Sequence, residues 1–140
     1  MKEKERELLE ELKIAFAKER DIIALYLFGS ATTNLFSTHS DIDLAILLEE
    51  PFNYRRTLLL SAQASLILKK DNIDLLALNT TPLFLTYRIL REGKLLFCQD
   101  EEILSNFVES ILQQYFDFKP DLESYYQDFQ YSFKKAYGNR

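Results

Sequence analysis

Apolar residues in this chain form short continuous runs, separated by segments in which they recur at helical spacing. The runs are rich in isoleucine, leucine and phenylalanine, and several stop at glycine or at charged residues. Short runs of this kind predict buried β-strands. We expect strands at residues 22–28, 41–48, 72–78 and 94–97.

Apolar residues three and four positions apart predict helices between these strands. The expected helices cover residues 2–19, 53–68, 82–92 and 101–137, with a short one at 30–36 and a break in the last at 119–121. Thr81 is expected to cap the helix that starts at Pro82. The first two long helices should face inward through Leu8, Leu9, Leu12, Ile14, Phe16, Leu59, Leu60, Ala64, Ile67 and Leu68.

The alternation of helices and strands predicts an α/β or α+β domain with helices packed on a sheet. A length of 140 residues suits a single domain. We expect a core over about residues 20–97 and a C-terminal helical extension over about 100–137.

Composition and charge exclude several classes of protein. Hydrophobic residues make up 47% of the chain and charged residues 28%, which is typical of a folded globular protein. The net charge of -5 and the lack of a long basic run disfavour a protein that binds nucleic acid through its phosphates. Cys98 is the only cysteine, so an internal disulfide framework is excluded. With no apolar stretch of about 20 residues, no membrane association is expected and we place the chain in the cytoplasm.

Three aspartates lie within or at the start of apolar strands. Asp41 and Asp43 are two residues apart, so their side chains share one face of a strand. Asp74 interrupts the next apolar strand. If the two strands are neighbours, three carboxylates converge on a site suited to Mg²⁺ or Mn²⁺. Two such ions could serve an in-line phosphoryl or nucleotidyl displacement.

Gly29 and Ser30 follow the first strand and precede the expected short helix. A glycine lets the backbone approach a phosphate closely, and a helix N-terminus with a hydroxyl offers donors to an anion. Each signal is common by itself, so the argument rests on their combination with the aspartates.

The combination Gly29-Ser30, ten residues, then Asp41-Ile42-Asp43 resembles the signature of the DNA polymerase beta-like nucleotidyltransferase superfamily. The resemblance covers about residues 20–97. Within this superfamily, the segments at residues 26–30 and 89–97 resemble those of a smaller group, the minimal nucleotidyltransferases (MNT), which include MntA-type antitoxins.

This resemblance implies the nucleotidyltransferase fold, with a small mixed sheet. It implies that Gly29 and Ser30 hold the triphosphate of ATP, that Asp41 and Asp43 bind two Mg²⁺ ions, and that Asp74 is the third carboxylate and candidate base. It also implies a HEPN-domain toxin of the HepT type as partner, an RNase that is silenced when AMP is transferred from ATP onto its tyrosine. That activity is the antitoxin role of a type VII toxin–antitoxin system.

The loop after Ser30 departs from the family, because many relatives carry an arginine there and this chain has Ala31-Thr32-Thr33. The missing positive charge leaves open a catalytically weak antitoxin that acts by binding. A small-molecule nucleotidyltransferase that modifies an antibiotic also stays open. Residues that could supply the charge instead are Arg55, Arg56, Lys69, Lys70, Arg88 and Lys94.

Aromatic and apolar residues recur at helical spacing near the C-terminus. Core packing explains such a stripe, and so does a surface for a partner or for self-association, through which the chain would form a homo- or hetero-oligomer. The residues are Leu122, Tyr125, Tyr126, Phe129, Phe133 and Tyr137.

Overall fold

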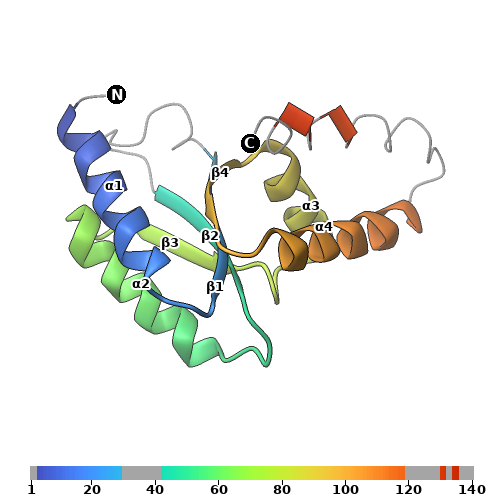
Figure 1. Cartoon of the computed structure of the whole chain (residues 1–140), viewed down its shortest axis with the longest axis horizontal. Coiled ribbons are helices and arrows are strands. Elements are labelled where there is room, and N and C mark those ends of the chain that lie inside the picture. Colours follow the sequence, from blue (N-terminus) through green and yellow to red (C-terminus); the bar gives the residue numbers. More distant parts are fainter. Residues whose placement is uncertain (1–2, 30–41, 119–129, 132–133, 136–140) are drawn as a thin grey trace.

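The computed structural model describes residues 3–29, 42–118, 130–131 and 134–135. Within them a four-stranded sheet has the order β3-β2-β1-β4 (Figure 1). Strand β1 pairs antiparallel with both of its neighbours, whereas β2 and β3 are parallel. The mixed sheet confirms the predicted fold class. The strands are β1 (Ile22–Phe28), β2 (Ile42–Leu48), β3 (Ile73–Ala77) and β4 (Lys94–Cys98).

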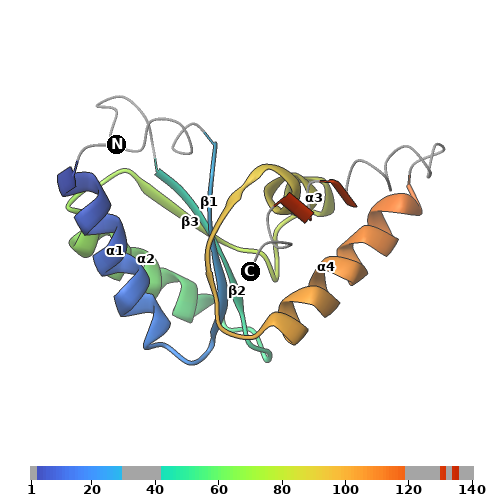
Figure 2. The same cartoon turned by 45° about the horizontal axis from the view of Figure 1, so that its top comes forward.

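Helices cover both faces of the sheet. Helices α1 (Glu3–Ala17) and α2 (Tyr54–Leu68) lie on one face, and α3 (Leu83–Glu92) and α4 (Glu101–Phe116) lie on the other (Figure 2). Asn53 caps α2 and Asp100 caps α4, each through a side chain that accepts a hydrogen bond from a backbone N–H of the first turn. Such a cap stabilises a helix by about 1 kcal/mol.

The sheet separates two hydrophobic layers, and each central strand contributes to both. In β1, Leu25 and Leu27 pack in the layer of α1 and α2, while Ala24 and Tyr26 pack in the layer of α3 and α4. Strand side chains alternate between faces, so a strand covered on both sides must be apolar at nearly every position. This explains why the sequence shows continuous runs.

Most of the predicted boundaries agree with the structure to within one or two residues, but three details were wrong. Ile14 and Leu59, expected inside, are 57% and 60% exposed. Thr81 does not cap α3, because Pro82 occupies the cap position; the Thr81 hydroxyl donates to the carbonyl of Ala77. The expected helix at 30–36 lies outside the described residues, as does most of the C-terminal aromatic stripe.

None of the described helices is long and apolar enough to cross a membrane.

Candidate active site

Gly29 directly follows β1 and has a backbone conformation that other residues rarely adopt. Its φ angle is +73°, in the left-handed region. A Cβ atom added there would collide with carboxylate oxygen Oδ2 of Asp43. The backbone at Gly29 therefore packs directly against that carboxylate, and both the angle and the space require glycine.

Asp43 lies near the start of β2, and its neighbours across the sheet complete the site. It pairs with Phe28 on one side and with Asp74 of β3 on the other. Paired residues on neighbouring strands lie about 5 Å apart and point to the same face. Asp43 and Asp74 are thus adjacent carboxylates, one half-buried and the other exposed.

The same alternation gives Asp43 its direction. Ile42 and Leu44 are fully buried in the layer of α1 and α2. Asp43 and Asp74 therefore face the layer of α3 and α4, at the end of the sheet where β1 stops and β2 and β3 begin. The expectation that Asp43 lies opposite its apolar neighbours agrees with this arrangement.

Two of the five residues proposed for the site, Ser30 and Asp41, lie outside the described residues. The structure brings together Gly29, Asp43 and Asp74. In the part of the chain that is described, no group of three or more His, Cys, Asp or Glu is arranged to hold a metal ion. Of the three carboxylates predicted for the site, the described residues therefore include two, Asp43 and Asp74.

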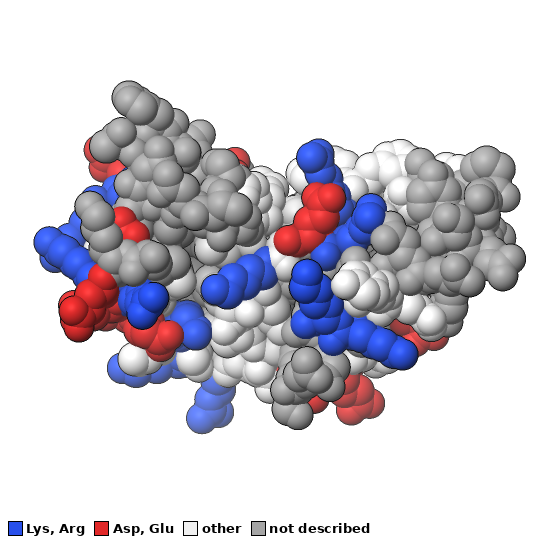
Figure 3. All heavy atoms as spheres, turned by 90° about the horizontal axis from the view of Figure 1, so that it is seen from above, with Lys and Arg blue, Asp and Glu red and all other residues white. Residues whose placement is uncertain are grey.

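Basic residues gather at the same end of the sheet. Lys94 begins β4 and pairs with Leu27, two residues before Gly29. Figure 3 looks onto this end and shows Lys and Arg side chains over α3 and the start of β4. A cavity of about 520 Å³ opens there. Its lining residues are Arg91, Glu92, Gly93, Lys94, Leu95, Tyr131 and Lys135.

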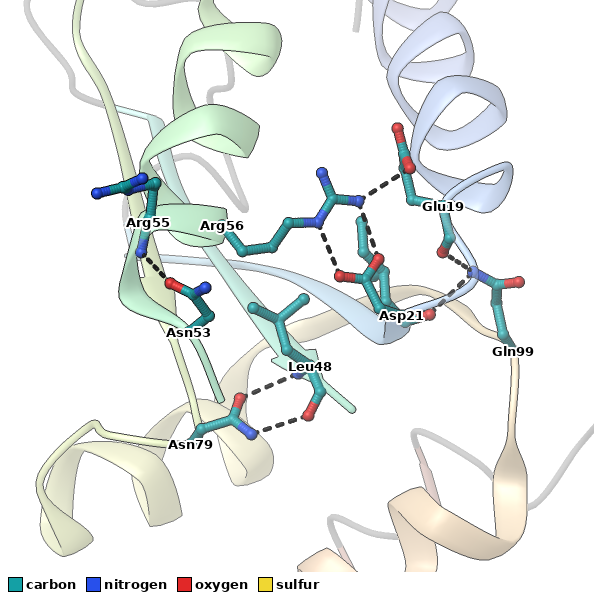
Figure 4. Close-up of polar contacts among 9 residues, drawn as sticks. Glu19, Asp21, Leu48, Asn53, Arg55, Arg56, Asn79 and Gln99 are labelled. Carbon is teal, nitrogen blue, oxygen red and sulfur yellow. Dashed lines mark hydrogen bonds and ion pairs between the residues drawn. The ribbon is translucent and has the colours of Figure 1, made fainter. Parts of the chain in front are cut away.

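Of the cations considered from sequence, the structure excludes Arg56 from this site. Its guanidinium binds both carboxylate oxygens of Asp21, at 2.7 and 2.9 Å, and Glu19 at 2.9 Å (Figure 4). The hydrogen bonds with Asp21 raise the pKa of Arg56 and lower that of Asp21. This cluster lies before β1 and therefore at the opposite end of the sheet, where it joins α2 to the turn after α1.

Lys94 was among the sequence candidates, whereas Arg91 and Lys135 were not. Arg88, another candidate, is exposed and pairs with Glu92 at 3.3 Å. The signal for Arg91 was its place in the Arg91-Glu92-Gly93-Lys94 phrase between a helix and a strand. Lys135 is far away in sequence, and only the folded chain brings it to the cavity.

The donor set decides which ligands suit this site. Asp43 and Asp74 offer only carboxylate oxygens, which suit Mg²⁺ and are poor ligands for softer metals. At Gly29 the absence of a side chain lets the backbone lie directly against the Asp43 carboxylate. Lysine and arginine side chains over α3 and the start of β4 lie at the same end of the sheet. These features fit a magnesium-bound nucleotide.

Comparison with protein families and structures agrees with this chemistry. The family model described as "Polymerase beta, Nucleotidyltransferase" matches residues 10–102. A comparison with curated protein sequences found no significant match.

Similar folds occur in solved toxin–antitoxin structures. One contains AMP-PNP; its chain is 20% identical, with a TM-score of 0.65, over 86% of this chain and 98% of that one. Another holds a tri-AMPylated Shewanella oneidensis HEPN toxin with an MNT antitoxin, at 21% identity and a TM-score of 0.62, covering 89% and 98%. A third, of MntA-HepT, is 21% identical with a TM-score of 0.61 and the same coverage. At this identity the likeness establishes the fold.

Proposed function

Because this chain belongs to the polymerase beta nucleotidyltransferase family, we propose that it is the adenylyltransferase antitoxin of a toxin–antitoxin pair. It transfers AMP from ATP to a tyrosine hydroxyl of a HEPN-type RNase toxin and so silences the toxin. The reaction takes place in the cytoplasm.

One observation carries the proposal. Asp43 and Asp74 are register partners on parallel strands, and Gly29 packs against Asp43. Two carboxylates so close repel each other unless a cation lies between or beside them. The arrangement therefore favours binding of Mg²⁺, with Asp41 as the third carboxylate and Ser30 beside the phosphates.

The chemistry assigned to these residues is an in-line displacement. The tyrosine oxygen attacks the α-phosphorus of ATP, the bond to the bridging oxygen breaks, and pyrophosphate leaves. Two bound Mg²⁺ ions would supply charge neutralisation for the attacking and leaving oxygens. Asp74, the more exposed carboxylate, accepts the tyrosine proton, while Gly29 and Ser30 orient the phosphates.

The partner is inferred from the neighbouring structures, whose descriptions name an MNT antitoxin with a HEPN toxin, and in one case the toxin carries AMP. This chain spans nearly the full length of those chains, so no large segment of theirs lacks a counterpart here.

The test is transfer of label from α-labelled ATP, with Mg²⁺, to proteins that co-purify with the chain. Wild type should label one partner, identified by mass spectrometry as modified on tyrosine. Asp43→Asn and Asp74→Asn should each reduce the rate on the order of a hundredfold or more. Asp71→Asn is the matched control, since Asp71 is an exposed carboxylate three residues before Asp74.

Two results would contradict this proposal. If no protein is labelled, yet the partner remains bound and inhibited by the Asp43→Asn variant, the chain neutralises its partner by binding. The missing loop arginine favours that second function. If label passes to an added antibiotic and not to protein, the chain is a small-molecule nucleotidyltransferase.

A further inference from the structure

The outer face of α2 carries a stripe of exposed leucines. Leu58, Leu59 and Leu66 are 53%, 60% and 80% exposed, on the side of the helix that faces away from the sheet. Arg55 and Lys69, at the two ends of the stripe, are exposed as well. Single exposed apolar residues are normal on a protein surface, whereas several on one helix face indicate a contact surface.

Helix α1 lies beside α2 on the same face of the sheet and has the opposite charge on its outer side (Figure 1). Glu3, Glu7 and Glu10 recur there at helical spacing and are exposed, and Ile14, one turn further, is 57% exposed. The sequence of α2, in contrast, contains two arginines and no acidic residue, and two lysines follow it directly. An acidic stripe on α1 thus lies next to the leucine stripe of α2.

The two helices run in opposite directions. Arg56, in the first turn of α2, binds Glu19 and Asp21, which follow the end of α1 (Figure 4). The end of α1 therefore lies beside the start of α2. Since both helices have 15 residues, the start of α1 lies beside the end of α2, where Lys69 stands.

Charge decides how two copies of this face can meet. If α2 packed against α2, basic residues would face basic residues and the two acidic stripes would also meet, which is unfavourable. A two-fold axis parallel to the helices instead places α1 of each copy against α2 of the other. Because a two-fold contact is self-complementary, the match of acidic with basic side chains then occurs twice.

The same arrangement brings apolar residues together. A rotation about an axis parallel to the helices keeps each residue at its height along them, so Glu7 of one copy lies near Lys69 of the other. Ile14 lies near Leu59, and each covers apolar surface of the other. Lys18 and Arg55 fall at the far end of the contact, where long side chains extend into solvent.

We propose that this face binds a second copy of the chain, with the leucine stripe of α2 packed against the acidic stripe of α1 across a two-fold axis. A helix of 15 residues is about 22 Å long. Two neighbouring helices present a face about 20 Å wide. A face of this size is at the low end for specific interfaces, so the dimer should be weak, with a dissociation constant on the order of micromolar.

This pairing leaves the candidate active site open. Asp43 and Asp74 face the layer of α3 and α4, whereas the contact lies on the outer side of the layer of α1 and α2. The dimer therefore carries two separate sites that face outward. Its formation does not depend on the proposed transfer reaction.

The experiment measures self-association of the isolated chain by sedimentation velocity, at concentrations up to about 200 µM because the interface is small. Wild type should change from monomer to dimer as the concentration rises. Leu66→Glu places a charge in the contact and should weaken the dimer about tenfold or more. Ile103→Glu is the matched control, because Ile103 is an apolar residue of α4 that is 39% exposed in the other helix layer, and this variant should dimerise like wild type.

Charge reversal tests the orientation. Lys69→Glu and Glu7→Lys should each weaken self-association, because like charges then meet at both contacts of the dimer. An equal mixture of the two variants should form a heterodimer, in which opposite charges face each other at both contacts again. Both residues are exposed, so the variants should fold, and melting curves will verify this.

Four outcomes would overturn the inference. Wild type could remain a monomer at every concentration, or the mixture of the two charge variants could remain monomeric. Stronger self-association of Lys69→Glu would show that α2 meets α2. If Leu66→Glu dimerises like wild type and instead loses binding to a co-purifying protein, the leucine stripe docks that protein.

Discussion

Replacing Gly29 with alanine perturbs the site at its closest backbone contact. The new Cβ must adopt a φ of +73° and must occupy space held by Oδ2 of Asp43. The left-handed conformation costs a residue other than glycine about 1 to 2 kcal/mol. Displacing a packed neighbour adds about 1 to 3 kcal/mol. Reduced entropy of the unfolded chain offsets less than about 1 kcal/mol of this cost.

We therefore expect Gly29→Ala to lower the free energy of unfolding by about 2 to 4 kcal/mol. Urea denaturation followed by tyrosine fluorescence measures it, because the chain has 8 tyrosines and no tryptophan. ATP binding should also weaken, since the Asp43 carboxylate must move. A destabilised protein with unchanged ATP affinity would place the nucleotide elsewhere.

A double-mutant cycle isolates the contact from the backbone strain. Asp43→Ala removes the carboxylate that the new Cβ would meet. Gly29→Ala made in that variant should therefore lower the free energy of unfolding only by the cost of the left-handed backbone conformation. The two changes should then be non-additive by about 1 kcal/mol or more. Additivity within about 0.5 kcal/mol would refute the claim that Gly29 and Asp43 are in contact.

Three further predictions concern stability. Arg56→Met should lower the free energy of unfolding by about 1 kcal/mol or less at pH 7. Because Asp21 has a lowered pKa, this difference should fade as the pH falls below 3.8 and the carboxylate protonates. A difference that does not change with pH would contradict the prediction. Leu12→Ala, at a fully buried position, should cost about 3 kcal/mol, whereas Leu59→Ala should change stability by less than about 0.5 kcal/mol; urea midpoints will compare them. Asn79→Ala removes the two hydrogen bonds from the Asn79 side chain to the backbone of Leu48, the last residue of β2. It should lower the free energy of unfolding by about 1 to 2 kcal/mol, which thermal melting will detect.

Sequence patterns predicted the strands well because both faces of the sheet are covered, which leaves a strong apolar signal. The predictions failed where periodicity alone had to indicate which face of a helix is buried. Ile14 and Leu59 lie in helices where exposed apolar residues stand next to buried ones. Which of them is buried depends on how each helix packs on the sheet, and the strands of the sheet are distant in sequence. The Thr81 cap failed because Pro82 occupies the cap position of α3, which places Thr81 one residue before the cap.

The candidate site was predictable in part for a similar reason. The spacing in Asp41-Ile42-Asp43 and the position of Asp74 showed which residues would converge if β2 and β3 paired, and the structure provides that pairing. The basic cavity could not be foreseen, because it depends on β4 pairing with β1 and on Lys135 reaching it from the C-terminal region. The single-domain assignment and the C-terminal aromatic stripe stay predictions.

The place of Asp43 in the sheet bears on how this site can change over evolution. Its strand is paired on both sides, so its backbone position is held by the ladder and its distance from Asp74 depends little on which apolar residues fill the layers. Substitutions can therefore accumulate through the core while the spacing of the carboxylates is conserved. Such robustness explains how chains that share only about a fifth of their residues keep one fold.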